Sequence, residues 1–307
     1  MPLETLHAAV GRFAPSPTGN LHFGSLLAAV ASFAQARATG GRWLVRIEDI
    51  DPPRVVPGSA ENILADLERF NMRSDRPVLY QGKRTAAYRS AVQQLLDQGL
   101  AYWCGCSRAD LPESGVYPGT CRHGLPAGKR RRSVRLAAPR HPVRFTDLVQ
   151  REVSEDLQKT VGDFVIWRAD GLPAYQLAVV VDDAFQGVTE VVRGADLLES
   201  TARQIHLQRS LGLATPSYAH HPIALGEDGR KLSKRFGSDP VAAAAPARTL
   251  QMALRFLGQP CPDGPNLEAT WRWALDNWRL ARVPQCHGIP WPSARATASG
   301  YNTGRPE

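Results

Sequence analysis

The stretch from Arg12 to Ser25 constrains the fold of this chain more than any other part of the sequence. A short apolar segment meets two prolines and a glycine, and a long apolar run over residues 26–37 follows and ends at Gly40. A strand, a Gly/Pro turn and a helix point backbone N–H groups and the positive helix end at an anion, commonly phosphate. His22 can reach such an anion, and Gly24 leaves room for a ligand beside the backbone. From this stretch alone, a capped helix after a strand explains the pattern equally well.

A second buried strand is predicted over residues 43–51, where an apolar segment ends in carboxylates. Strand, helix and strand in succession form a βαβ unit, and ligands in such sheets bind beyond the carboxyl ends of the strands. Glu48 is therefore expected at the edge of a pocket. The alternative for Glu48 is a salt bridge to Arg46 or Arg54.

Periodicity predicts most of the remaining elements. We expect amphipathic helices over residues 59–70 and 85–98, further helices over 201–212 and 242–258, and regular structure over 163–168 and 189–196. Residues 177–183 form a continuous apolar run, which predicts a central strand. Trp271, Trp273 and Trp278 recur at helical spacing and are expected in the core.

Composition narrows the possible partners and the compartment. The net charge of +8 is compatible with a polyanionic partner, and the basic run over residues 129–132 is either a solvated loop or a surface that tracks a phosphate backbone. No signal peptide is evident, no uncharged apolar stretch is long enough to span a bilayer, and five cysteines argue against a disulfide framework. We therefore expect a cytoplasmic protein with no membrane partner.

Two lysines bracket a serine in a second candidate for anion binding, Lys231-Leu232-Ser233-Lys234. Each ammonium group could neutralise charge that builds up as pyrophosphate leaves, and the flanking glycines could let the loop close. A lone pair of lysines at this spacing is a weak signal. Its combination with the stretch around His22 is a strong one.

Residues 104–144 are rich in Gly, Pro, Arg and Cys, which indicates an inserted module. Cys104, Cys106 and Cys121 could occupy three corners of a tetrahedral zinc site. His123 would be the ordinary choice for the fourth ligand. The alternative is that the three cysteines are unrelated reduced residues.

The two candidate anion-binding segments together resemble the HIGH and KMSKS signatures of class I aminoacyl-tRNA synthetases. Residues 12–19 and 46–49 resemble the glutamyl branch of that family, and the resemblance covers about residues 11–240. Glutamyl-tRNA synthetases continue into a helical anticodon-binding domain, whereas few residues follow the lysine motif here. The chain therefore resembles most the glutamyl-Q tRNA(Asp) synthetases, which lack that domain.

The resemblance implies an α/β fold with a Rossmann-like catalytic core, an inserted zinc-bearing module and a short helical C-terminal region. We expect the catalytic domain over residues 1–102 and 163–238 and the inserted, acceptor-binding-like module over 103–162. We expect the helical region over 239–289 and a poorly ordered tail over 290–307.

The resemblance also implies which residues bind substrates and metal. The residues for glutamate would be Arg12, Phe13, Ala14, Pro15, Ser16, Glu48, Tyr175 and Arg193. The residues for ATP would be His22, Gly24, Ser25, Lys231, Ser233 and Lys234, of which His22, Lys231 and Lys234 would be catalytic. The zinc ligands would be Cys104, Cys106, Tyr117 and Cys121, because the family pattern places a tyrosine four residues before the last cysteine. Guanidinium forks and one carboxylate suit a substrate that carries two carboxylates and an ammonium group.

The implied reaction is activation of L-glutamate by ATP with Mg²⁺, followed by transfer of glutamate to queuosine in the anticodon of tRNA(Asp). We expect a monomer with one structural zinc ion. No protein nucleophile is needed, because the substrate carboxylate attacks the α-phosphorus of ATP. Three alternatives stay open at this point: a minimal glutamyl-tRNA synthetase that charges a tRNA 3′ end, a zinc-bearing RNA-binding protein without catalysis, and a nucleotidylyltransferase of the same superfamily.

Overall fold

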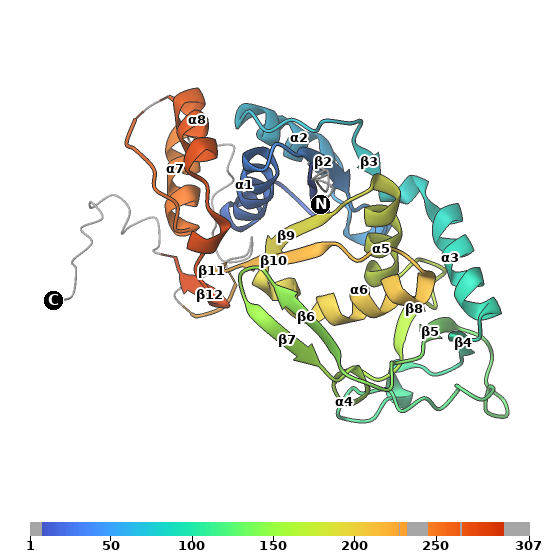
Figure 1. The fold of residues 1–307 in the computed structure, drawn as a ribbon. Helices are drawn as coiled ribbons and strands as arrows, with labels where there is room; N and C mark the ends of the chain where they lie inside the picture. The colour runs from blue at the N-terminus through green and yellow to red at the C-terminus, as the bar shows by residue number, and fades with distance from the viewer. Residues whose placement is uncertain (1–7, 227, 232–244, 265, 292–307) are drawn as a thin grey trace, which may run out of the picture.

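The computed structural model describes residues 8–226, 228–231, 245–264 and 266–291, and Figure 1 traces the course of the chain. The strands are β1 (Val10–Phe13), β2 (Arg42–Ile47), β3 (Leu79–Tyr80), β4 (Ala101–Cys104), β5 (Ser133–Leu136), β6 (Val143–Asp147), β7 (Arg151–Glu155), β8 (Phe164–Trp167), β9 (Glu190–Gly194), β10 (Ser217–His221), β11 (Ile223–Leu225) and β12 (Gly288–Pro290). The α-helices are α1 (Phe23–Ala38), α2 (Ser59–Arg69), α3 (Thr85–Asp97), α4 (Leu157–Thr160), α5 (Tyr175–Gln186), α6 (Leu198–Leu211), α7 (Pro246–Phe256) and α8 (Leu267–Asn277).

The central sheet is assembled from two distant parts of the chain. β1, β2 and β3 pair in parallel, and so do β9, β10 and β6. The Thr189 N–H donates to the Val10 carbonyl at 3.0 Å, which brings β9 beside β1. The strand order is therefore β3-β2-β1-β9-β10-β6, with β7 antiparallel on β6. The strand order proceeds from β1 to β3 on one side and from β9 to β6 on the other. A ligand crevice is therefore expected where the order reverses, at the carboxyl ends of β1 and β9.

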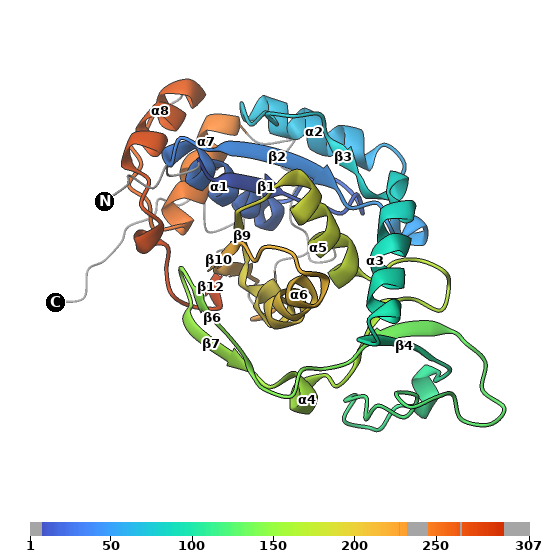
Figure 2. The ribbon, with the colours of Figure 1, turned by 45° about the vertical axis from the view of Figure 1, so that its right-hand side comes forward.

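Helices cover both faces of this sheet (Figure 2). One core contains residues of α1, α2, α7 and α8, and the other contains residues of α3, α5 and α6. Successive residues of a strand alternate between these cores, as a period of two requires. Val192 and Ala219 pack on the α1 side, and Val191 and Tyr218 pack on the α5 side.

The predicted central strand over residues 177–183 is wrong, because these residues belong to helix α5. A short apolar run does not by itself distinguish a buried strand from a buried helix. Here the helix continues until Gly187, whose φ of 67° provides a left-handed cap. Its last turns carry Asp182 and Asp183, which are buried and bind arginines.

The other predicted elements lie close to the observed ones. The helices expected over 59–70, 85–98 and 201–212 are confirmed as α2, α3 and α6. α7 lies within the expected range 242–258, of which residues 242–244 are outside the described part of the chain.

Of the three tryptophans expected in the core, Trp271 and Trp278 are confirmed. Trp271 Nε1 donates to the Phe70 carbonyl at 2.7 Å, and Trp278 Nε1 donates to Gln35 Oε1 at 2.8 Å. The prediction is wrong for Trp273, whose exposed fraction is 45%. Residues two positions apart on a helix do not face the same side, so the neighbour of Trp271 at this spacing faces solvent.

A smaller antiparallel sheet of β4, β5 and β8 lies beyond α3 (Figure 1). The end of β4 places Cys104 in a third small core with Tyr117 and Cys121. Within residues 103–162, β5 belongs to this smaller sheet, whereas β6 and β7 extend the central sheet beside β10. That extension brings part of the expected insert next to the carboxyl end of β10.

Candidate active site and metal centre

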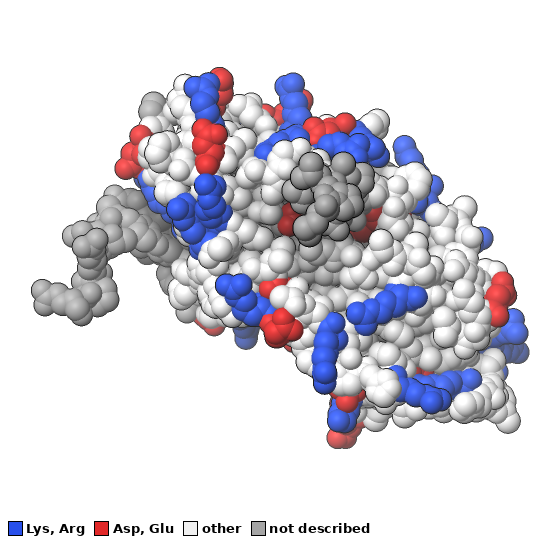
Figure 3. Space-filling view, viewed as in Figure 1, with Lys and Arg blue, Asp and Glu red and all other residues white. Residues whose placement is uncertain are grey.

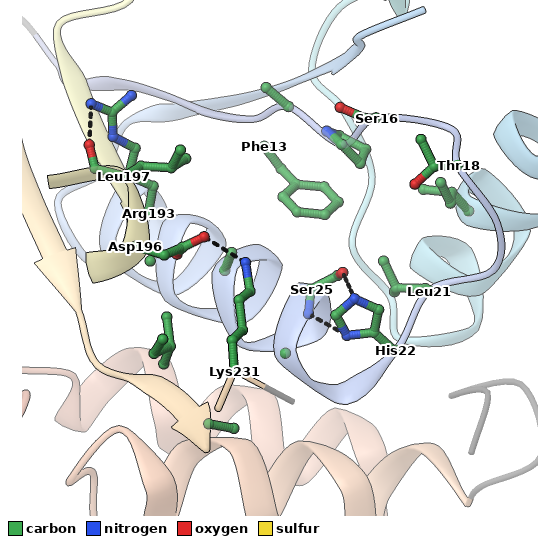
Figure 4. A pocket seen from close by; sticks show the side chains of 18 of the residues that line it. Phe13, Ser16, Thr18, Leu21, His22, Ser25, Arg193, Asp196, Leu197 and Lys231 are labelled. Carbon is green, nitrogen blue, oxygen red and sulfur yellow. Dashed lines mark hydrogen bonds and ion pairs between the residues drawn. The ribbon is translucent and has the colours of Figure 1, made fainter. Parts of the chain in front are cut away.

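The loop after β1 leads directly into the N-terminus of α1, as the Gly/Pro turn predicts. His22 is the N-cap of α1, and its Nδ1 accepts the Ser25 N–H at 3.3 Å. Since Nδ1 accepts this hydrogen bond through its lone pair, the proton of the neutral ring lies on Nε2, which is 3.0 Å from Ser25 Oγ (Figure 4). The first turn contains no acidic side chain, so the positive end of the helix is not neutralised there.

A cavity of about 680 Å³ opens at the carboxyl ends of β1 and β9. It is lined by most of the residues that the sequence predicts for the site. These lining residues are Arg12, Phe13, Ala14, Pro15, Ser16, His22, Gly24, Ser25, Tyr175, Arg193 and Lys231. Segments far apart in the sequence thus meet at one cavity, as the crevice between β1 and β9 requires.

Arg193 stands near the end of β9 and is held along one edge of its guanidinium group. Its Nε donates to His220 Nε2 at 2.9 Å, and its Nη2 donates to Thr201 Oγ1 at 2.9 Å. Nη2 also lies 3.4 Å from the Leu197 carbonyl, which Figure 4 shows. Nη1 is buried and has no hydrogen-bond partner among the described residues. An unpaired buried guanidinium N–H is costly, and an anionic ligand in the cavity would satisfy it.

Arg12 and Arg46 share one carboxylate behind the cavity wall. Asp183 Oδ1 lies 2.7 Å from Arg46 Nη1 and 3.4 Å from Arg12 Nε. Burial opposes the charge on Asp183, but Arg46 and Arg12 outweigh it and hold the pKa of this carboxyl below its ordinary value. Asp183 therefore fixes both guanidinium groups, of which only that of Arg12 lines the cavity.

Glu48 lies behind this wall and does not line the cavity. Its Oε1 is 3.5 Å from Arg46 Nη2, which is one of the two salt bridges named as its alternative, whereas Arg54 lies 3.9 Å from Asp51. Burial raises the pKa of Glu48 to about 7, although Arg46 and Arg12 oppose the rise. Tyr175, the first residue of α5, lines the cavity nearby; burial and then the Glu48 charge raise its pKa.

Lys231 reaches the cavity from the segment after β11. Its Nζ lies 2.5 Å from Asp196 Oδ2 (Figure 4), and Asp196 also lines the cavity. Ser233 and Lys234, which complete the predicted motif, lie outside the described residues.

Three thiols converge at the end of β4. The Sγ atoms of Cys104, Cys106 and Cys121 all lie within 4.8 Å of one another, and those of Cys106 and Cys121 are 3.7 Å apart. Tyr117 Oη completes the group at 3.3 Å from Cys104 Sγ and 3.6 Å from Cys106 Sγ. His123 is exposed and is not part of this group.

The neighbours of the thiols favour a thiolate at Cys104. Arg135 Nε donates to Cys104 Sγ at 3.4 Å, and its guanidinium lies 3.8 Å above the Tyr117 ring. Burial opposes the thiolate, but hydrogen bonds from Tyr117 and from the Cys106 N–H, together with Arg135, bring the pKa of Cys104 down to about 7.

Several polar residues in or near the cavity were missed from the sequence, among them Asp147, Asp183, Asp196 and His220. Asp196 follows the end of β9 by two residues, so the rule that ligands bind beyond strand ends could have indicated it. No strand is predicted over residues 143–147 or 217–221, so the same rule gives no signal for Asp147 and His220.

The surface and the helices add two observations. In Figure 3 the lower half of the face shown, over β6 and β7, carries more Lys and Arg than Asp and Glu. No helix among the described residues is both long and apolar enough to cross a membrane.

Comparison with known proteins agrees with this site. The family model of the catalytic domain of class I tRNA synthetases (E and Q) matches residues 9–115 and 122–245. A protein of Pseudomonas aeruginosa named glutamyl-Q tRNA(Asp) synthetase is 52% identical over 287 residues, which are 92% of this chain and 97% of that protein. One of Aromatoleum aromaticum with the same name is 51% identical over 286 residues, 90% of each chain.

The fold is also similar to a solved glutamate-tRNA synthetase from Elizabethkingia anophelis. The TM-score is 0.79 at 26% identity, and the match covers 95% of this chain and 70% of that one. The chain belongs to the class I tRNA synthetases of the glutamyl and glutaminyl type, a family of ligases, and within them to the glutamyl-Q tRNA(Asp) synthetases.

Proposed function

We propose that this enzyme activates L-glutamate with ATP and transfers the glutamyl group to queuosine in the anticodon of tRNA(Asp). The observation that carries the proposal is the single cavity at which the loop after β1, the end of β9 and Lys231 meet. The names of relatives that are about half identical over nearly their whole length support the same substrates.

In this proposal Arg12 and Arg193, two of the arginines that line the cavity, bind the carboxylates of glutamate. Arg193, on β9, offers Nη1. Arg12 lies on β1, the other strand of the crevice, and is held by Asp183. Glu48 lies behind the wall and supplies negative charge for the substrate ammonium, while Tyr175 closes the same side. Phe13, Ala14, Pro15 and Ser16 form the floor beside them.

The phosphates of ATP, which enters with Mg²⁺, bind at the start of α1. His22, Gly24 and Ser25 line the cavity there, and the helix end is positive. Lys231 exchanges its partner Asp196 for a phosphate oxygen, and Ser233 and Lys234 act on the same group by their place in the motif. The substrate carboxylate then attacks the α-phosphorus, and pyrophosphate leaves. Catalysis is therefore positioning and charge stabilisation.

One zinc ion fits the group at the end of β4. Zn–S bonds of about 2.3 Å in a tetrahedron place sulfur atoms about 3.8 Å apart, and the observed pair is 3.7 Å apart. Cys104, Cys106, Cys121 and Tyr117 would hold the ion, and Tyr117 rather than His123 is the fourth ligand. Bound zinc would stiffen a segment whose own apolar core is small.

The acceptor step needs no protein nucleophile either. A hydroxyl group of the queuosine ring attacks the carbonyl carbon of glutamyl-adenylate and forms an ester. The bond between that carbon and the phosphate oxygen breaks, AMP leaves, and the hydroxyl proton passes to water. We also propose that the enzyme works as a monomer.

The activation step is tested by glutamate-dependent exchange of labelled pyrophosphate into ATP without tRNA. We expect exchange, because the proposed pocket is complete within this chain. Exchange that needs glutamine instead of glutamate, or that appears only with tRNA, would contradict the proposal.

The acceptor is tested with tRNA(Asp) that carries queuosine, the same tRNA with guanosine at that position, and tRNA(Glu). We expect glutamate transfer to the first tRNA alone, and loss of transfer after periodate cleaves the ring diol. Charging of unmodified tRNA(Glu) would instead identify a minimal glutamyl-tRNA synthetase.

A further inference from the structure

Asp147, the last residue of β6, lies behind Arg193 and is fully buried. Its Oδ1 accepts three backbone N–H groups, those of Val149 at 3.0 Å, Gln150 at 2.8 Å and His220 at 3.1 Å. Its Oδ2 lies 2.6 Å from His220 Nδ1. The three N–H groups all bind Oδ1, so the other oxygen, Oδ2, faces the imidazole ring.

This carboxylate determines the tautomer of His220. Since Oδ2 of Asp147 accepts, Nδ1 of His220 carries the proton and Nε2 keeps its lone pair. That lone pair accepts the Nε–H of Arg193 at 2.9 Å. Burial and Arg193 bring the pKa of His220 down to about 4 against the opposing effect of Asp147, so the ring is neutral at neutral pH. A proton on Nε2 would put an N–H group against another N–H group.

Asp147, His220 and Arg193 thus form a relay of hydrogen bonds. This relay holds one edge of the Arg193 guanidinium group and leaves Nη1 for a ligand. His220 binds Nε, and Thr201 binds Nη2 at 2.9 Å. The Tyr218 ring, 5.4 Å from the guanidinium carbon, packs beside it. Nη1 has no hydrogen-bond partner in the part of the chain that the structure describes, and Arg193 lines the cavity. The orientation of Nη1 thus depends on His220 and Thr201, neither of which lines the cavity.

We propose that Asp147 and His220 are positioning residues that orient Arg193 for the carboxylate of the amino-acid substrate. The inference rests on the proposed function, in which Arg193 binds glutamate. Because β6 lies within residues 103–162, the relay also connects the expected inserted module directly with the amino-acid pocket.

The substitution Asp147→Asn tests the relay with almost no change of shape. The three backbone N–H groups keep an oxygen at the Oδ1 position, so the amide NH₂ must face His220 Nδ1. The ring proton then moves to Nε2, where it opposes Arg193 Nε–H. We expect the KM for glutamate in pyrophosphate exchange to rise about tenfold or more, as misplaced binding groups cause, while the KM for ATP changes less than about twofold. Asp66→Asn is the matched control, a buried aspartate on α2 that binds Arg69, and should leave the KM for glutamate unchanged.

A second pair of variants separates positioning from folding. His220→Gln keeps an oxygen that can accept from Arg193 Nε, whereas His220→Ala does not. We expect the KM for glutamate of His220→Gln to lie much closer to the wild-type value than that of His220→Ala. Arg193→Lys, which lacks the guanidinium group, should show the largest rise in this KM. Thermal melting checks that each variant is folded.

The tautomer itself is measured from the ¹⁵N chemical shifts of His220, independently of activity. We expect the proton on Nδ1 in the wild type and on Nε2 in Asp147→Asn. A KM for glutamate within about twofold of wild type in folded Asp147→Asn and His220→Ala would overturn the inference. An equal rise in both KM values, or His220→Gln no better than His220→Ala, would also overturn it. A wild-type enzyme that shows no glutamate-dependent exchange refutes the proposed function, and the inference then falls with it.

Discussion

At the scale of single residues, Glu48 is unusual because it is buried beside two arginines and still has a raised pKa. The rise from 4.5 to about 7 means that burial outweighs the attraction of Arg46 and Arg12, both of which also bind Asp183. A carboxyl whose pKa is higher in the folded protein binds its proton more tightly there. Folding is therefore penalised as the pH rises from about 4.5 to 7.

This penalty predicts a pH-dependent effect of Glu48→Gln. The shift corresponds to on the order of 3 kcal/mol, which the wild type loses between pH 4.5 and 7 and the variant does not. The Tm of the variant relative to wild type should therefore be higher at pH 8 than at pH 5. Thermal melts at both pH values measure this, with exposed Glu61→Gln as a control for the loss of one carboxylate. A Tm difference that is the same at both pH values would contradict the pKa shift.

At the scale of elements, α8 shows how one helix face is chosen by its contacts. Trp271 packs against Phe33 with ring centroids 4.9 Å apart and donates to the Phe70 carbonyl, whereas Trp273 faces solvent. The same residue type on one helix thus has two roles.

This contrast predicts unequal costs for two equal truncations. Trp271→Ala should lower the free energy of unfolding by about 3–5 kcal/mol, because it opens a cavity and removes a buried hydrogen bond. Trp273→Ala should change it by less than about 0.5 kcal/mol. Urea denaturation of both variants gives the comparison, and equal losses would show that α8 does not pack through the Trp271 face.

The metal centre belongs to the end of β4 and the segment that follows it, before β5. If the four-ligand site is right, purified protein contains about one zinc ion per chain. Cys106→Ser should lower the zinc content and the Tm, while Cys261→Ser, which changes a cysteine far from the cluster, should change neither. Metal analysis and thermal melting measure both effects.

The fourth zinc ligand is tested separately. Tyr117→Phe should reduce zinc affinity, and His123→Ala should not, because the exposed His123 is not part of the cluster. The opposite result would show that His123 binds the metal instead, and zinc-free protein of unchanged stability would rule out the site.

At the scale of the whole molecule, the net charge of +8 favours binding of a polyanionic partner. Arg130 and Arg132 are exposed and lie in the densest basic run. If they contact phosphates of the tRNA, replacing both by Gln should weaken binding at low salt. It should also reduce the slope of log affinity against log salt by about 0.7–0.9 per lost contact. Filter binding at several salt concentrations measures the slope. Arg272→Gln on α8, where Arg272 pairs with Glu268 at 3.2 Å, is the control, and an equal effect there would point to non-specific attraction.

The parts of this enzyme that depend on local signals could be predicted from the sequence. The strand, turn and helix around His22 follow from prolines, glycines and periodicity, and Cys104, Cys106 and Cys121 lie close together in the sequence. Such signals depend on backbone preferences within a few residues, so they can be read without a fold.

Which distant residues share a site could not be predicted in this way, because it depends on how the chain packs. The tertiary structure paired Arg46 with Asp183, placed Glu48 behind the cavity wall and set Asp147 and His220 behind Arg193. It also made residues 177–183 a helix, since a buried apolar run suits either element until its neighbours are known. These outcomes depend on contacts between residues far apart in the chain, and the energies of such contacts arise from packing and burial, which no local pattern records.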